Sequence, residues 1–432
     1  MIAQTWRALP PGWPRRGWRD RLGVALSNPA LVRPVFSVLR RFAPVLRVGR
    51  RVIVSNHADV VEVLRRDTDF TIAEVNGARM ARWSGTFILG TDRGEVYERE
   101  SGVLQRAASV DDLERVRAIV VGAAAPLLET AQPTGRLDVV NGLARVVATR
   151  VVGDYFGTPG PDDGSTMRWL RALFDGVFLD DSPRAREAAS LAIAEQRPYM
   201  EHLIATTRAA QAAGEPVPDT VLSRLVAMGE DEPWLDDDAV RRCVNGLMVG
   251  ALETTSKTVT HVVDELLRHP EALAAARRVA LDGDLDIVRG YAWEALRFRP
   301  HGILLVRHCA RDTTLGRRAT QVPAGTRVMV STISAMFDEA AFPQAGRLRP
   351  DRPDDRYVHF GHGLHACFGR HINAVQVTEL VAAVVRLPGL RRAEGAEGRI
   401  SYDGPFPDRL IVEFDPPGAA VPGPLAKAEA SR

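Results

Sequence analysis

One cysteine of this 432-residue chain lies where its sulfur could bind a metal. Cys367 belongs to the stretch Phe-Gly-His-Gly-Leu-His-Ala-Cys-Phe-Gly at 360–369, whose glycines let the backbone approach a bulky group closely. The apolar residues at 372–385 predict a buried helix that ends before Pro388, which places Cys367 at or just before a helix N-terminus. The helix dipole favours a thiolate there, and a cysteine thiolate is one of the protein ligands of haem iron.

Two other interpretations of this loop stay open. A lone cysteine beside a turn is commonly a buried structural residue. The nearby histidines could also bind zinc together with the cysteine; they are His359, His362, His365 and His371. Their alternating positions in a glycine-rich loop differ from the paired spacings of zinc sites, so haem is the favoured ligand.

A carboxylate and a hydroxyl follow the centre of a long predicted helix. The helix is expected from Asp236, as its N-cap, to Arg268, and its centre is apolar almost all round, as in a helix buried on all sides. Glu253 and Thr254 come next, and their burial is costly without partners. Thr254 either donates back to the carbonyl of Gly250 and bends the helix, or serves a reaction at that bend.

These two stretches resemble motifs of the cytochrome P450 family. Residues 360–369 match its haem-binding loop, Phe-Gly-x-Gly-x-His-x-Cys-x-Gly, at every fixed position. Residues 250–254 resemble its oxygen-activation motif, Ala/Gly-Gly-x-Asp/Glu-Thr, with Ala251 where the second glycine is usual. The two motifs lie at the family's spacing, about 110 residues apart.

A third motif is an ion network. Glu294 and Arg297, three residues apart on one predicted helix face, resemble the family's Glu-x-x-Arg pair. Arg352 supplies the arginine that completes this network shortly before the haem loop. The three are expected to hold the proximal side of the haem pocket and to take no part in catalysis.

The resemblance implies a mainly α fold with small β-sheets and a long central helix that crosses the haem. It implies haem b, iron protoporphyrin IX, as the cofactor. The residues expected to bind it are Cys367, as the iron ligand, with His365, Arg307, Tyr97, Phe360, Gly361 and Gly369. Thr254 is expected to serve oxygen activation and Glu253 to supply protons.

The chain departs from the family pattern at one point. Members commonly carry a His and an Arg that reach a haem propionate, where the best alignment here places Tyr97 and Ser101. One propionate would then lack its usual cation unless Arg99 or Arg106 takes that role.

The other elements follow from local patterns. A hairpin is predicted around Gly49 at 44–56, a helix at 58–66 and a loop at 71–95. Further helices are expected at 98–107, 110–131, 138–156, 165–178 and 184–213, a strand at 300–306, and a turn at 322–326 followed by a short strand through Val328, Val330 and Ile333. Substrate-pocket candidates are Arg79, Met80, Trp83, Phe178, Met248, Ile303, Leu304 and Phe406, which suggest an apolar ligand.

Composition is that of an ordinary globular protein, with 45% hydrophobic residues and a net charge of +2. No nucleic-acid footprint is present, and three scattered cysteines indicate a reduced, cytoplasmic setting. An N-terminal segment (1–43), one catalytic domain (44–414) and a disordered tail (415–432) are expected. No stretch is apolar enough to span a bilayer, whereas residues 21–46 could lie on a membrane surface or, as the favoured use, pack on the protein's own core.

The expected function is a monooxygenase that inserts one oxygen atom from O2 into an apolar small molecule. Because no flavin or nicotinamide fingerprint is visible, electrons are expected from a separate ferredoxin or flavodoxin. A peroxide-using or rearranging haem-thiolate enzyme is the nearest alternative. A haem-based sensor or binding protein is a more distant one.

Overall fold

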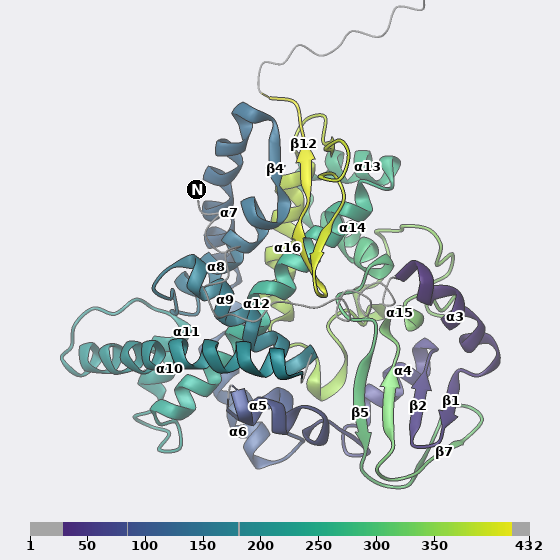
Figure 1. Cartoon of the computed structure of the whole chain (residues 1–432), viewed down its shortest axis with the longest axis horizontal. Helices are drawn as coiled ribbons and strands as arrows, with labels where there is room; N and C mark the ends of the chain where they lie inside the picture. The colour runs from purple at the N-terminus through teal and green to yellow at the C-terminus, as the bar shows by residue number, and fades with distance from the viewer. Residues whose placement is uncertain (1–28, 84, 180–181, 417–432) are drawn as a thin grey trace, which may run out of the picture.

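The computed structural model describes residues 29–83, 85–179 and 182–416, and Figure 1 shows a mainly helical molecule with small sheets. The helices are α3 (Pro29–Phe42), α4 (His57–Arg65), α5 (Ala78–Trp83), α6 (Glu95–Ala107), α7 (Leu113–Ala131), α8 (Arg145–Asp154), α9 (Asp163–Phe174), α10 (Pro183–Ala212), α11 (Val221–Met228), α12 (Asp237–Leu266), α13 (Pro270–Leu281), α14 (Leu285–Phe298), α15 (Thr332–Ala335) and α16 (Arg370–Val385). The expected fold class is therefore confirmed.

The strands are β1 (Val45–Val48), β2 (Arg51–Val54), β3 (Phe70–Thr71), β4 (Arg136–Asp138), β5 (Leu305–Cys309), β6 (Thr313–Leu315), β7 (Thr320–Val322), β8 (Arg327–Val330), β9 (Arg391–Arg392), β10 (Ser401–Asp403), β11 (Phe406–Arg409) and β12 (Ile411–Glu413). The largest sheet has the order β1-β2-β8-β5-β3, with β2 and β8 parallel and its other neighbours antiparallel. Gly49, with φ +59°, makes the predicted turn between β1 and β2.

Helix α12 lies at the centre of the molecule and fulfils the prediction of a long buried helix (Figure 1). It begins where expected, because the side chain of Asp236 accepts a hydrogen bond from the N–H of Ala239 at 2.8 Å. Helices α8, α9, α14 and α16 pack around it. Residues on α12 are thereby shielded from solvent along most of its length.

The predicted loop at 71–95 is wrong, because this stretch contains a π-helical turn at 73–77, helix α5 and a 3₁₀ turn at 88–90. Side chains distant in sequence set these turns. Asp92 accepts from the N–H groups of Ile72 and Ala73 at 2.7 and 3.1 Å, and Asn76 donates to the carbonyl of Leu89 at 3.1 Å. A search for apolar periodicity cannot detect such bonds.

Two strand boundaries also differ from the prediction. The strand expected at 300–306 begins at Leu305, and residue 333 lies in helix α15 after β8 has ended at Val330. Ser331 caps α15 by accepting from the N–H of Ser334 at 3.2 Å, which ends the extended run. The helices predicted between 98 and 213 form, with end shifts of a few residues.

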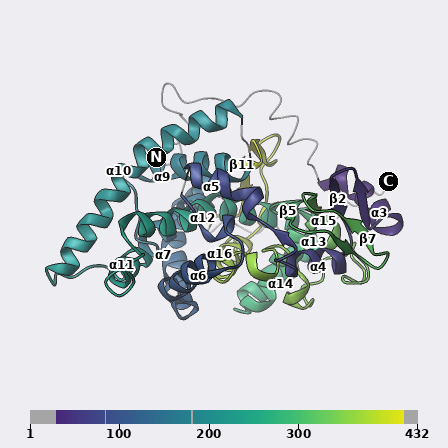
Figure 2. The same ribbon diagram turned by 90° about the horizontal axis from the view of Figure 1, so that it is seen from below.

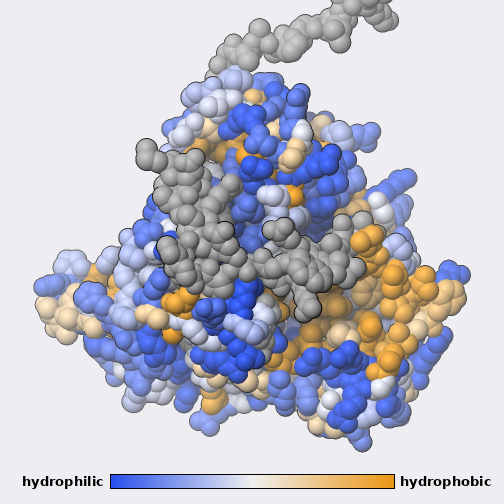
Figure 3. Space-filling model, viewed as in Figure 1, coloured by the Kyte–Doolittle hydropathy of each residue, from blue (hydrophilic) through white to orange (hydrophobic). Residues whose placement is uncertain are grey.

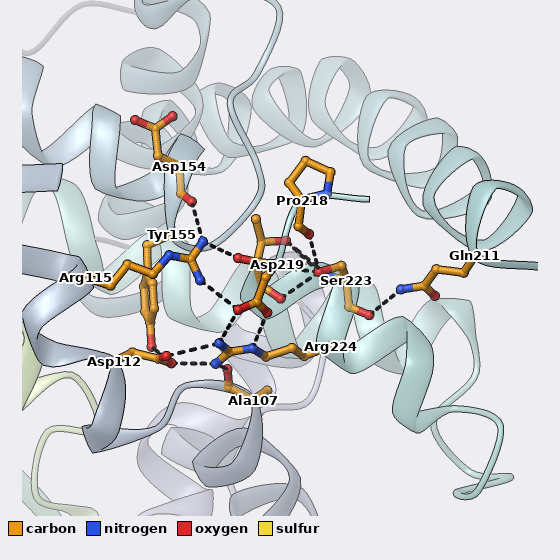
Figure 4. A network of polar contacts seen from close by, with 11 residues as sticks. Ala107, Asp112, Arg115, Asp154, Tyr155, Gln211, Pro218, Asp219, Ser223 and Arg224 are labelled. Carbon is orange, nitrogen blue, oxygen red and sulfur yellow. Dashed lines mark hydrogen bonds and ion pairs between the residues drawn. The ribbon is translucent and has the colours of Figure 1, made fainter. Parts of the chain in front are cut away.

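A polar network fastens α11 to α7 and α8 (Figure 4). Arg224 pairs with both Asp112 and Asp219, at 2.6 Å from Asp219, and the hydroxyl of Tyr155 donates to Asp112 at 3.0 Å. Hydrogen bonding from Arg224 lowers the pKa of Asp112, which keeps this carboxylate charged. The network is structural: it joins helices and supplies no group to the cysteine loop.

The two ends of the chain reach beyond the described residues. The tail predicted to be disordered lies outside the described residues from 417 onward, and residues 1–28 of the N-terminal segment also lie outside them. The last part of the predicted N-terminal segment (1–43) forms α3, which Figures 1 and 2 place at the end of the molecule opposite α10. Within the described ranges, no helix combines the length and apolar character needed to cross a membrane.

Candidate active site

The cysteine loop is fixed by its backbone. Cys367 lies between a 3₁₀ turn at 363–365 and helix α16, and its N–H donates to the carbonyl of Phe360 at 2.7 Å. Gly361 and Gly363 have φ of +72° and +71°, a region that favours glycine. A Cβ on Gly363 would collide with the backbone of Leu64, so the loop can pack against α4 only with glycine at this position.

The protein's own groups do not favour the thiolate form of Cys367, so the expected preference for a thiolate is wrong where no metal is bound. Burial is the largest influence and raises the pKa of the Cys367 thiol, while the N–H of Gly369 and the charge of Arg370 lower it. A metal bound to the sulfur would reverse this balance, because a coordinating thiol is deprotonated. Among the described residues, no three His, Cys, Asp or Glu side chains gather as metal ligands, so the zinc alternative has no ligand set there.

Helix α12 faces open space at Gly250. A Cβ built on Gly250 would meet no atom within 4 Å, although α12 is central, and the same is true of Gly369 beside the cysteine. The hydroxyl of Thr254 donates to the carbonyl of Gly250. The expected bond back along the helix therefore forms, and the helix can bend at this point.

Glu253 is held as an ion pair. The carboxylate is 1% exposed, and its Oε2 lies 3.1 Å from Arg145 of α8 and 3.4 Å from Arg171 of α9. Its Oε1 has no hydrogen-bond partner among the described residues. Arg171 also reaches Asp403 of β10 at 3.0 Å, so the pair is connected to the half-exposed side chain of that residue.

Arg307 and His365 form a second polar group, near the cysteine. Arg307 is 5% exposed, its guanidinium donates to the carbonyl of Val306 at 2.9 Å, and burial lowers its pKa to about 10. Burial, followed by the charge of Arg307, lowers the pKa of His365 to about 4. Arg307 has no carboxylate within ion-pair distance among the described residues, and Nδ1 of His365 has no partner there. The charge of Asp92 reaches Arg307 without forming an ion pair, and a buried cation that lacks such a contact indicates a site for an anionic ligand.

Tyr97 anchors the loop instead of supplying a cation. Its hydroxyl donates to the carbonyl of Leu364 at 2.7 Å, and its ring meets that of His365 edge-on with centroids 5.4 Å apart. Together with Ser101 it lines a cavity of about 380 Å³ against the cysteine loop. The sequence thus places a hydrogen-bonded phenol where the family commonly has a histidine.

Neither arginine considered as a replacement cation is available. Arg99 stacks on the ring of Trp234 at 4.3 Å, and Arg106 pairs with Glu232 at 2.9 Å. Both side chains are directed by these partners away from the loop. The expectation that one of them fills the role is not supported.

The predicted ion network is confirmed. Glu294 and Arg297 are fully buried and form a two-pronged pair at 2.9 Å, while Nε of Arg352 lies 3.2 Å from Glu294. The hydroxyl of Tyr357 and the N–H of Arg349 also donate to this carboxylate, both at 2.8 Å. Arg297 donates further to three backbone carbonyls of 336–347, which holds the chain that leads to the cysteine loop.

The substrate-pocket candidates do not all gather in one place. Phe406 lies on β11 and Phe178 follows α9, and the ring of Phe174 lies 5.2 and 5.0 Å from theirs. His301 lies beside them at the start of the half-buried stretch 301–306, and Trp83 of α5 lies against Gly176 in the turn that carries Phe178, whereas Met80 is buried against Gly90. Arg79 is only partly buried.

Sequence reasoning missed the cations around this cluster. Lys257 is 8% exposed, donates to the carbonyl of His301 at 2.8 Å and lies 5.4 Å from the ring of Phe406. Arg171 covers the same ring at 4.2 Å. The spacing of Glu253 and Lys257, four residues apart on one helix face, was the available signal for Lys257. No local signal marks Arg145 or Arg171.

Comparisons with known proteins agree with this arrangement. A family model described as Cytochrome P450 matches residues 165–387. The mycinamicin IV hydroxylase/epoxidase of Micromonospora griseorubida is 31% identical over 265 residues, which cover 61% of this chain and 62% of that protein. The match therefore spans less than two thirds of that relative's length.

Two further similarities extend this picture. The C-19 steroid 1alpha-hydroxylase of Sorangium cellulosum is 30% identical over 288 residues, 64% of this chain and 69% of that protein. The crystal structure of CalO2 superposes with a TM-score of 0.79 and 25% identity, covering 91% of this chain and 98% of that one.

Replacement of Glu294 by Ala tests the buried network. The change leaves Arg297 and Arg352 without their counter-charge, at a cost of about 3–5 kcal/mol, so we expect little folded protein. Asp286→Ala is the matched control, since Asp286 pairs with Arg289 on the same helix with the same spacing, but is 83% exposed. Urea unfolding should show a change within about 0.5 kcal/mol for the control. Equal stability of the two variants would contradict the structural role of Glu294.

The burial of Lys257 predicts a pH dependence. Desolvation, with a smaller contribution from Arg171, lowers its pKa to about 7 from 10.5. Between these values the unfolded chain binds the additional proton, so the free energy of unfolding rises with pH. Relative to Lys257→Met, we expect the wild type to gain up to ~1.4 kcal/mol per pH unit across this window. Denaturant titrations from pH 7 to 10 measure it, with the exposed-pair variant Arg289→Met as control; parallel curves for wild type and Lys257→Met would refute the prediction.

Proposed function

The chain belongs to the cytochrome P450 family, and we propose that it is a haem-thiolate monooxygenase acting on a largely apolar small molecule. The observation that carries the proposal is the glycine-framed Cys367 together with a buried cation, Arg307, that forms no ion pair among the described residues. The names of two relatives specify hydroxylation or epoxidation of mycinamicin IV and hydroxylation of a C-19 steroid, which supports oxygen insertion as the reaction.

Haem iron is the cofactor of this family, and the residues present fit it. Cys367 would ligate the iron, and Arg307 with His365 would meet the carboxylates of haem b, which supply the anion that these groups lack. The open space beside Gly250 and Gly369 leaves room next to α12 and to the cysteine. Phe360 and Gly361 shape the loop, and Tyr97 fixes it through Leu364.

When bound through a thiolate, haem iron supplies the oxidising chemistry that transfers one oxygen atom from O2 to the substrate. We assign the delivery of protons for this reaction to Glu253 and Thr254. Oε1 of Glu253, which has no partner among the described residues, is the atom that accepts and releases a proton, while Oε2 stays with Arg145. The hydroxyl of Thr254 leaves the carbonyl of Gly250 to pass the proton on.

The aromatic cluster of Phe174, Phe178 and Phe406 supports an apolar substrate and the exclusion of water from it. We assign electron supply to a separate ferredoxin or flavodoxin, with the protein acting in the cytoplasm. Screening lipids, terpenoids and aromatic metabolites for a ligand-induced Soret shift would identify the substrate class.

A peroxide-using enzyme of the same family is the second candidate. It is favoured by one observation, the double ion pair that holds Glu253 in place and would slow its release for proton delivery. Product analysis with O2 and a redox partner, compared with hydrogen peroxide alone, separates the two functions.

Replacement of Cys367 by His tests the iron ligand. The reduced wild type with CO should show the strongly red-shifted Soret band of a thiolate complex, because the thiolate donates electron density to the iron. Cys367→His should lose this band even where haem is retained. Cys309→Ala, at a buried cysteine of β5, should keep it. A red-shifted band in Cys367→His would contradict the assignment.

Replacement of Thr254 by Ala tests the proton path. We expect nearly normal substrate binding and reduction, less oxygenated product and more released hydrogen peroxide, with a loss of about 10²-fold in the step that the hydroxyl serves. Thr255→Ala is the matched control, since Thr255 makes the same bond back along the helix, at 2.6 Å to the carbonyl of Ala251, and meets Asn373 of α16 at 3.2 Å. Unchanged coupling of electron use to product in Thr254→Ala would remove this residue from the mechanism and favour the peroxide-using candidate.

A further inference from the structure

Helix α3 (Pro29–Phe42) is attached to the rest of the protein through arginines. Arg33 donates to the carbonyl of Phe298, and its guanidinium lies 4.3 Å from the ring of Phe337. Arg40 donates to the carbonyl of Ser334 at 3.1 Å and to its hydroxyl at 3.0 Å. Arg33 and Arg40 thus face the protein beside a narrow apolar contact made by the buried Phe36 with the partly buried Val32 and Leu39.

The apolar side of α3 faces solvent. Leu31, Val35, Val38 and Phe42 follow one another at helical spacing and are 60%, 60%, 58% and 64% exposed. Figure 3 shows a hydrophobic patch at the position of this helix. The expectation that the apolar residues of 21–46 pack on the protein's own core therefore holds for Phe36, which is buried, and is wrong for this row. A contiguous exposed apolar patch marks an interaction site.

The surroundings of this row are cationic. Residues 21–58 contain seven arginines and no acidic residue. Arg41, Arg47, Arg50 and Arg51 are exposed and form no ion pair within the described part of the chain. Arg318, also exposed, donates to the carbonyl of Phe42 at 3.2 Å and adds a further charge at the end of the row.

These charges decide between the partners that could cover the row. A second copy of this surface would bring arginines against arginines, which is unfavourable. A partner that has an apolar interior beneath a negatively charged surface would contact both the apolar row and the surrounding arginines. An amphipathic helix with arginines at its edges is typical of proteins that lie in the interface of an anionic bilayer.

We propose that α3 is a peripheral membrane anchor, whose row of Leu31, Val35, Val38 and Phe42 inserts among the lipids. Arg41, Arg47, Arg50 and Arg51 meet the lipid phosphates. The contact is interfacial and needs no helix that crosses the bilayer. It is independent of the oxygen chemistry proposed above.

Vesicle co-sedimentation of the haem-loaded full chain tests the proposal. Binding to phosphatidylcholine vesicles containing phosphatidylglycerol should be at least about tenfold tighter than to phosphatidylcholine alone, and should weaken as salt is raised. Val35→Asp with Val38→Asp should reduce binding at least about tenfold. Arg47→Gln with Arg50→Gln should weaken binding to the anionic vesicles alone.

Leu281→Asp is the matched control, since Leu281 is 56% exposed on α13, away from α3, and its replacement should not change binding. The haem spectrum and thermal midpoint of each variant report folding. Binding that persists in Val35→Asp/Val38→Asp would overturn the proposal. A wild type that does not bind anionic vesicles would also overturn it. In that case, a wild-type dimer that the double variant dissociates would identify a second copy as the partner of this row. A lower thermal midpoint of the double variant would instead indicate coverage by residues 1–28.

Discussion

Burial of polar groups along the centre of α12 is the constraint on which this structure depends. Glu253 is compensated by Arg145 and Arg171, and through them the β10–β11 hairpin is tied down at Asp403 and at the carbonyl of Pro407. Each of these groups would be costly to bury alone. The helix that carries the proposed chemistry is therefore also the helix that sets the position of the elements around it.

In contrast to Glu253, the buried charge of Arg307 beside His365 is not held in an ion pair by any described residue. Here Arg307 is a buried cation with no carboxylate in ion-pair contact among the described residues, and Nδ1 of the buried His365 has no partner there. Asp92 is the one carboxylate whose charge raises the pKa of Arg307, and it forms no ion pair with it, so an anionic ligand would stabilise this buried cation further. The deficit lies beside Cys367, which is what a cofactor with carboxylates and a metal requires.

Local signals in the sequence were sufficient for the cysteine loop, the long helix with its Asp236 cap and the Glu294–Arg297 pair, because each depends on neighbours within a few residues. The helical turns at 73–90 depend on Asp92 and Asn76, which act across the stretch. Arg145 and Arg171 lie about 108 and 82 residues before Glu253 in the sequence and meet it only in the folded chain. The orientation of α3 likewise depends on the carbonyls of Phe298 and Ser334, which bind Arg33 and Arg40, so no property of α3 alone reveals it.

Tyr97 stands where the family commonly has a histidine, and it takes a different structural role. Its hydroxyl bonds to Leu364, and its ring supports His365, so the residue stabilises the loop and the imidazole rather than a negative charge. With Arg99 held by Trp234 and Arg106 by Glu232, Arg307 is the buried cation whose charge acts most on His365. Burial and the charge of Arg307 lower the pKa of His365, so its imidazole stays neutral beside this cation and can act as a hydrogen-bond donor without adding a second positive charge.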